Sequence, residues 1–150
     1  LGAKSWEGLQ LGRLMDKTKK IDLKKIEVRD LNRILQKRDG NNFNYFKIIN
    51  PMGAHAIATG LDNDIDVLID GHVGYYCAGM NQQSSVTING NAGVGIAENM
   101  MSGKVVVRGD ASQSAGATGH GGLLVIEGNA SARCGISMKG IDIVVGGSVG

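Results

Sequence analysis

A period of 19 residues runs through residues 67–150 without a gap, and it constrains the fold more than any other feature of the chain. Written in rows of 19, the sequence has an apolar residue at the first and third positions of every row. A unit this short cannot bury its own apolar face, so successive units must stack on one another. The first column holds Val67, Val86, Val105, Leu124 and Ile143, and the third holds Ile69, Ile88, Val107, Ile126 and Val145.

A glycine follows each apolar stretch, and a small polar residue or a histidine comes directly after it. A short β-branched stretch that ends in such a pair is typical of a strand followed by a tight turn. Stacked helices are a poor alternative, because 24 of the 150 residues are glycine and each costs a helix interior about 1 kcal/mol. We therefore expect structural turns at Gly71, Gly90, Gly109, Gly128 and Gly147.

These features predict a mainly β fold, namely a right-handed, single-stranded parallel β-helix with 19-residue coils. Strands of successive coils would lie about 4.8 Å apart. Residues 46–66 resemble an imperfect earlier coil, in which Ile48 lies 19 residues before Val67 and Gly60 lies 19 before Gly79. We therefore expect the β-helix domain to cover residues 41–150.

The first 40 residues differ from the rest of the chain in composition. They hold 11 Lys and Arg against 6 Asp and Glu, whereas 20 of the 24 glycines come later. An apolar stripe at helical spacing predicts a helix that ends near Gly40, and a weaker helix is expected upstream. We predict that residues 1–40 form a helical extension that caps the first coil. The stripe consists of Val28, Leu31, Ile34 and Leu35, and the upstream apolar residues are Trp6, Leu9, Leu14 and Met15.

One glycine pair resembles half of a nucleotide site. Gly93-Val94-Gly95 follows an apolar run, as in a phosphate-binding turn. Its row leads into another strand instead of a helix, and Glu98 stands where the third glycine of a dinucleotide fingerprint belongs. We interpret the pair as a structural corner. The stretch 116–122 lacks the Gly-Lys-Ser/Thr of a P-loop and is interpreted in the same way.

The thiols and imidazoles do not form a catalytic or metal-binding pattern. Cys77 and Cys134 share a column but lie three coils apart, about 14 Å, which is too far for a disulfide, so we expect small core residues. His55, His72 and His120 fall in different columns without ligand spacing. The acidic stretch 62–66 begins like a calcium loop but lacks its glycine and final glutamate. We expect no catalytic residue, cofactor or metal site in this chain.

Two sets of bulky apolar residues are candidate partner contacts. Side chains alternate faces along a strand, so the column between the two inward ones should form an outer stripe. Two adjacent bulky residues cannot both point inward, so at least one of each such pair should be exposed. The alternative is that the N-terminal segment covers these residues. The candidates are Leu68, Val106, Val125 and Val144 of the stripe, which Thr87 interrupts, and Tyr75, Tyr76, Met100 and Met101.

Hydropathy and charge narrow the class of protein. No apolar run approaches the length that spans a bilayer, so no membrane partner is expected. The basic residues of the first 40 positions are interleaved with acids and lack an aromatic platform, which favours a solvated helix face over nucleic-acid binding. Two cysteines without a secretion signal suggest reduced thiols in the cytoplasm.

The stretches NGNAGVG, VRGDASQSAGATGHGG and EGNASARCGISMKG resemble the GXGXG-motif domain, the β-helix at the C-terminal end of the glutamate synthase large subunit. NPMGAHAIATGL and DGHVGYYCAGMNQQ, with VRDLNRIL upstream, are most similar to its stand-alone version, the small subunit of N-methylglutamate synthase and split glutamate synthase complexes. The resemblance covers residues 21–150. It implies amidotransferase and FMN-binding synthase subunits as partners, with FMN and iron–sulfur clusters held there and not in this chain.

The function implied by this resemblance is a non-catalytic structural subunit of an oxidoreductase complex of nitrogen metabolism, which forms glutamate or N-methylglutamate. An alternative is the related β-helix subunit of formylmethanofuran dehydrogenase. A free-standing structural module that forms a homo-oligomer is an alternative from another class. A polysaccharide-cleaving β-helix is disfavoured, because the outer columns lack a cluster of acidic and basic residues.

Overall fold

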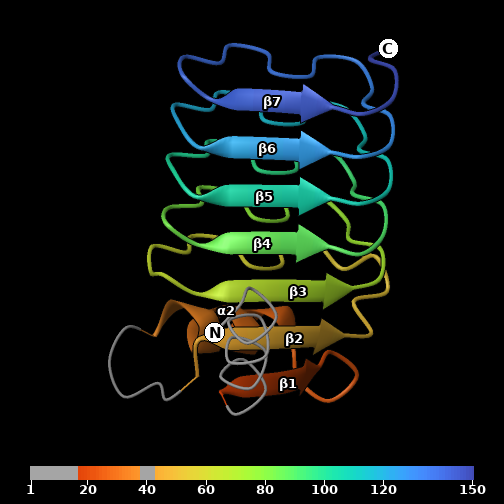
Figure 1. Ribbon diagram of the computed structural model, residues 1–150. Coiled ribbons are helices and arrows are strands. Elements are labelled where there is room, and N and C mark those ends of the chain that lie inside the picture. The colour runs from red at the N-terminus through yellow and green to blue at the C-terminus, as the bar shows by residue number, and fades with distance from the viewer. Residues whose placement is uncertain (1–16, 38–42) are drawn as a thin grey trace, which may run out of the picture.

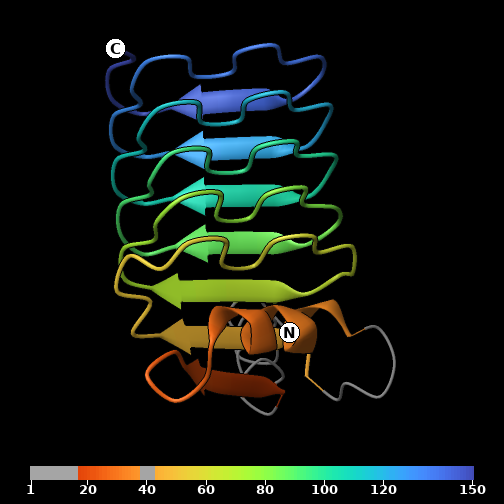
Figure 2. The same ribbon diagram turned by 180° about the vertical axis from the view of Figure 1, so that it is seen from behind.

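The described part of the chain, residues 17–37 and 43–150 of a computed structural model, contains one seven-stranded parallel sheet whose strands follow the order of the sequence. Every strand points the same way, and the chain returns behind the sheet after each one (Figure 1). Figures 1 and 2 together show a right-handed winding, as expected for crossovers between parallel strands. The predicted fold class is confirmed. The strands are β1 (Thr18–Asp22), β2 (Tyr45–Ile49), β3 (Asp66–Asp70), β4 (Ser85–Ile88), β5 (Lys104–Val107), β6 (Leu123–Ile126) and β7 (Asp142–Val145).

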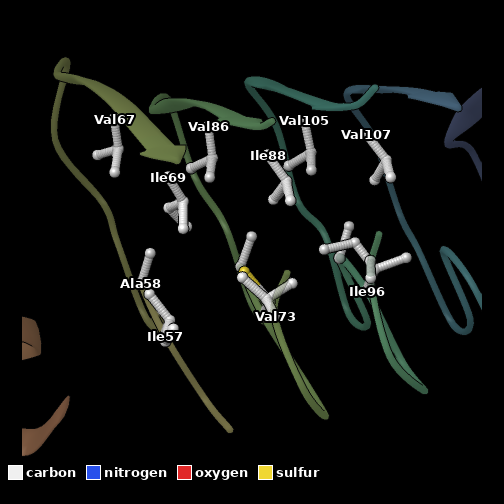
Figure 3. Close-up of a cluster of buried hydrophobic side chains, with 14 of the residues drawn as sticks. Ile57, Ala58, Val67, Ile69, Val73, Val86, Ile88, Ile96, Val105 and Val107 are labelled. Carbon is white, nitrogen blue, oxygen red and sulfur yellow. The ribbon is translucent and has the colours of Figure 1, made fainter. Parts of the chain in front are cut away.

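The predicted 19-residue register is confirmed from β3 to β7. Val67 pairs with Val86 and Ile69 pairs with Ile88, and the same offset continues to the last strand. These side chains point from the strands into the interior, toward residues of the opposite wall such as Ile96 (Figure 3). The two apolar columns therefore form one continuous core along the stack.

The coil between β2 and β3 is longer than the sequence predicted. Ile48 pairs with Ile69 and Phe46 pairs with Val67, which is an offset of 21 residues, so the alignment of Ile48 with Val67 was wrong. Extra residues are accommodated outside the strands, where no ladder constrains them. Gly60 still lies next to Gly79, because its N–H donates to the Gly79 carbonyl (2.9 Å).

The first strand was not predicted at all. β1 pairs in parallel with β2, from Thr18 with Tyr45 to Asp22 with Ile49. The sequence predicted only helical structure in residues 1–40, which is wrong for this segment. Ile21 is the one buried residue of this strand (5% exposed), and it lies between the exposed Lys20 and the partly exposed Asp22. The proposed domain boundary after residue 40 stays a prediction, although β1 belongs to the same sheet.

The chain returns behind the sheet through a second hydrogen-bonded surface, which we call the turn face. In each coil, every second residue of this surface has a positive φ, such as Tyr76 (58°), Ala78 (55°) and Met80 (58°). Their N–H groups bond alternately to the coils above and below. Tyr76 donates to the Val94 carbonyl (2.8 Å) and Ala78 donates to the Ile57 carbonyl (2.9 Å). The turn face comprises residues 75–80, 94–99, 113–118 and 132–137.

Helix α2 (Val28–Gln36) follows β1 and lies on the side opposite the strands, below the turn face (Figure 2). In the higher coils, the backbone of the coil below supplies hydrogen-bond partners to the turn face. Here Asn32 supplies them instead, because Ala58 N–H donates to Asn32 Oδ1 (2.8 Å) and Asn32 Nδ2 donates to the Ala56 carbonyl (2.9 Å). Gln36 Nε2 likewise donates to the Thr59 carbonyl (2.7 Å). The side chains of α2 therefore bond the lowest segment of the return path.

The predicted helix is confirmed between Val28 and Gln36, and Leu31 and Leu35 of its apolar stripe are fully buried. No helix in the described part of the chain combines the length and the apolar character needed to cross a membrane. Several residues of the predicted N-terminal helices lie outside the described residues, namely Trp6, Leu9, Leu14, Met15 and Gly40.

Candidate interaction surfaces

The glycine column lies at the corner after each strand, where successive coils touch backbone to backbone. Gly128 N–H donates to the Gly109 carbonyl (3.0 Å), and a Cβ on Gly128 would come within 2.6 Å of that oxygen. Gly93 stacks on Gly74 in the same manner, since a Cβ there would lie 2.7 Å from the Gly74 carbonyl carbon. Coil-on-coil packing therefore requires Gly93 whether or not an anion binds nearby.

The polar residues next to these glycines form a hydrogen-bonded ladder along the same corner. Asn91 N–H donates to His72 Nδ1 (2.9 Å), Asp110 N–H to Asn91 Oδ1 (2.8 Å), and Asn129 N–H to Asp110 Oδ1 (2.8 Å). Ser148 N–H continues the ladder to Asn129 Oδ1 (2.9 Å). Each side chain thus satisfies the backbone donor of the coil above, which explains why a small acceptor or a histidine recurs at this position.

The two thiols differ in burial and neither is in a disulfide. Cys77 is fully buried in the core, as predicted, and this burial raises the pKa of its thiol to about 12. Cys134 is only partly buried, and burial again raises the pKa of its thiol. At neutral pH both side chains are protonated, which is the unreactive form of the group.

Metal-binding side chains are scattered over the described part of the molecule. Within residues 17–37 and 43–150, no three His, Cys, Asp or Glu residues are close enough together to hold an ion. His55 has a structural contact instead, because its Nδ1 accepts a hydrogen bond from Tyr75 N–H (2.8 Å).

The outer stripe of the sheet faces away from the core, as the alternation of side chains predicts. Leu68, Val106 and Val125 are partly exposed, and Val144 is 54% exposed. A shallow hollow of about 330 Å³ crosses this face from β2 to the end of β5. Its outward lining residues are Tyr45, Asp66, Leu68, Ser85, Thr87 and Arg108. The role of the stripe as a partner contact stays a prediction.

Charged residues lie on both sides of the stripe, acidic ones on β3 and basic ones on β5, and the sequence analysis missed them. Asp66 and Asp70 stand at the two ends of β3, whereas Lys104 begins β5 and Arg108 directly follows it, and all four are exposed. Partial burial and the neighbouring Asp64 carboxylate raise the pKa of Asp66. The sequence shows these residues once the positions two before and two after each stripe residue are also taken to face outward.

The aromatic pair on the turn face is exposed, as expected for a contact surface. Tyr75 is 51% and Tyr76 50% exposed, and the His55 ring stacks on Tyr75 with 4.3 Å between ring centroids. Met101 is also exposed, but Met100 is fully buried, so its assignment as a partner contact was wrong. Met100 occupies the corner position that the fully buried Asn81 holds one coil earlier, where the chain turns its side chain inward.

A second hollow, of about 420 Å³, lies between α2 and the lowest segment of the return path. It was not predicted, because it arises only where the helix meets the first coil. Two arginines line it, Arg29 and Arg33, together with Asn32 and Gln36.

The fold is a right-handed parallel β-solenoid in which the sheet and the turn face both expose apolar or aromatic side chains. Among curated proteins, the chain is similar to Protein GlxC of Rhizobium meliloti (strain 1021), with 60% identity over 62 residues. The match covers 41% of this chain and 27% of that protein, so it spans about a quarter of the relative's length. No protein-family model matches the chain, and no solved structure matches it.

Proposed function

We propose that this chain is a rigid, non-catalytic structural subunit or domain of a glutamate synthase-type complex. The observation that carries the proposal is the unbroken stack of coils from β3 to β7, whose corner sequences resemble the GXGXG-motif domain. The similarity to Protein GlxC adds loose support over the 62 residues that it covers. In this proposal, the amidotransferase and the FMN-dependent synthase reside in partner subunits.

The physical basis of the proposed role is stiffness. Each coil is bonded to the next by a strand ladder on one side and by the turn face on the other. Six interstrand spacings of about 4.8 Å make the sheet roughly 29 Å long. A stack bonded on both sides moves as one body, so partners bound at different heights would be held at a fixed separation.

The cysteines of this chain do not fit an iron–sulfur cluster. Such clusters are generally held by several thiolates that meet at one point. The pKa of Cys77, about 12, keeps its thiol protonated at neutral pH, and Cys134 lies three coils away along the stack. We therefore assign FMN and iron–sulfur clusters to the partner subunits, and we propose the cytoplasm as the compartment where both thiols stay reduced.

We further propose that the turn face binds a partner subunit at Tyr75 and Tyr76. Tyrosine is enriched at the centres of protein interfaces, where it contributes large area with few rotatable bonds. The stacked His55 ring already orients Tyr75, so little side-chain freedom remains to be lost on binding.

Affinity capture of the native protein that carries this chain, followed by mass spectrometry, tests the proposal. Amidotransferase and FMN-binding synthase subunits should be recovered with it. Recovery of molybdopterin-binding subunits would favour the alternative of a formylmethanofuran dehydrogenase complex. If neither class is recovered, the proposal is contradicted and a free-standing structural module is favoured.

Two variants locate the contact. Tyr75→Glu should remove the partner subunits from the captured material, because a buried interface does not accommodate an unpaired carboxylate. Gln82→Glu introduces the same group at another exposed corner position and should leave capture unchanged. Equal loss in both variants would show that Tyr75 is not the contact.

A further inference from the structure

The outward side chains of β3, β4 and β5 have a charge pattern that is complementary to itself. β4 lies in the middle and presents only uncharged outward residues, with Thr87 at its centre. The β3 row on one side carries Asp66 and Asp70, and the β5 row on the other side carries Lys104 and Arg108. The strand register stacks Asp66, Ser85 and Lys104 in one column.

We propose that a second copy of this chain covers the sheet face, related to the first by a two-fold axis that runs parallel to the strands and passes over Thr87. This rotation puts β3 of each copy opposite β5 of the other, with the strands pointing the same way. Asp66 then meets Lys104, and Asp70 meets Arg108, each contact occurring twice by symmetry. The same rotation puts Leu68 against Val106 and joins the two apolar stripes.

The other face-to-face symmetry does not match the charges. A two-fold axis along the stack would place each strand against its own copy in the reverse direction. Asp66 would then oppose Asp70 of the second copy, and Lys104 would oppose Arg108. Like charges that face each other across an interface are strongly disfavoured, so the pattern selects the axis along the strands.

The charged rows are available for such a contact. Within residues 17–37 and 43–150, no ion pair engages the side chains of Asp66, Asp70, Lys104 or Arg108. Asp70 Oδ1 accepts a hydrogen bond from the neutral Asn89 Nδ2 (3.0 Å), which leaves the negative charge of the carboxylate without a cation. The pKa of Asp66 is raised first by its partial burial and then by repulsion from another carboxylate, Asp64. A cation from a second copy would relieve that repulsion.

The shape of the sheet also suits this packing. The strands stack with little visible twist (Figure 1), so two such faces can lie flat against each other. Strand spacing and residue rise give a face of about 30 by 16 Å. Two such faces would bury on the order of 1,000 Å², which is the size of a weak, reversible interface.

The test is the mass of the full chain in solution, measured by sedimentation velocity and light scattering over a series that reaches several hundred micromolar. The wild-type chain should approach twice its 15.7 kDa mass. Asp66→Lys and Lys104→Asp should each weaken the dimer at least about tenfold, because each puts like charges opposite one another. The double variant, Asp66→Lys with Lys104→Asp, should restore the dimer, because it exchanges the two signs.

Arg133→Asp is the matched control, since it makes the same charge change as Lys104→Asp at an exposed position of the turn face. It should leave the dimer unchanged, and thermal unfolding should show that every variant is folded. A wild-type chain that stays monomeric over the whole series overturns the proposal. The proposal is also overturned if the single charge reversals leave the dimer affinity unchanged, or if the double variant fails to restore the dimer.

Discussion

The strand face and the turn face meet the same stacking requirement with opposite backbone conformations. On the strand face, extended residues such as Val105 and Ile88 stack through a regular parallel ladder. On the turn face, every second residue is left-handed, and small residues such as Ala97 (φ 56°) fill the interior. Val105 and Ala97 are both fully buried, yet the two positions demand different side chains. Burial alone therefore does not decide which residue fits, and local conformation does.

The largest expected effect comes from putting a strand residue on the turn face. Ala97→Val should destabilise the fold by about 3 kcal/mol, because a β-branched residue strongly resists positive φ and the added methyls overpack a filled core. Chemical denaturation measures the change in unfolding free energy. Ala97→Gly is the control and should stay within about 1 kcal/mol of wild type, since glycine adopts positive φ freely. Equal losses in both variants would contradict a conformational cause.

The lower end of the turn face gives the next largest effect. Asn32→Ala should lower the unfolding free energy by about 2 kcal/mol, because it leaves the N–H of the buried Ala58 without its acceptor. Asn32→Asp retains an oxygen that can accept this bond and should recover part of the loss. If both variants unfold with the free energy of the wild type, the hydrogen bonds of Asn32 do not stabilise the lowest segment of the return path.

Burial of Cys77 on the inner side of the turn face should make the folding stability depend on pH. The pKa of the Cys77 thiol is raised from 9.0 to about 12, so above pH 9 the unfolded chain releases a proton that the folded chain keeps. Folding stability should therefore fall as pH rises from 9 towards 12, by about 1 kcal/mol at pH 10. Comparing wild type with Cys77→Ala between pH 8 and pH 10 isolates this contribution from other groups. A constant difference between them over that range would contradict it.

The smallest expected effect is a stabilisation. Arg133 has a φ of 61° and occupies the position that Gly95 holds two coils earlier. Arg133→Gly should raise the unfolding free energy by up to about 1 kcal/mol, because glycine removes the cost of a left-handed residue. Ala132→Gly, one residue away and outside the positive-φ positions, should instead lower it by a similar amount. A loss of stability in both would show that backbone strain at this position is negligible.

The coils from β3 to β7 were predictable because a solenoid brings each residue against its equivalent in the next coil. Val86 pairs with Val67 and with Val105, so a repeat in the sequence is also a repeat in the contacts. The outward stripe followed from the alternation of side chains along a strand. For Tyr75 and Tyr76 the sequence predicted only that at least one is exposed, whereas both are.

The errors fall where the repeat has no recognisable pattern of residue types. β1 was missed because a helix, not another coil, separates it from β2, and no glycine column marks its end. The corner at Met100 turns its side chain inward although the adjacent Met101 is exposed. β1 has no counterpart in the 19-residue pattern. The inward corner of Met100 does recur one coil earlier, at the buried Asn81, but the two residue types differ, so the sequence does not mark the position as a core column.

The amino-acid sequence by itself determined the coil length, the inward columns and the positions of the corners, because these depend on neighbours one period apart. Only the tertiary structure showed that Asn32 of α2 substitutes for a lower coil by bonding the backbone of Ala56 and Ala58. That contact joins segments with no common period, and it depends on how the chain closes in space.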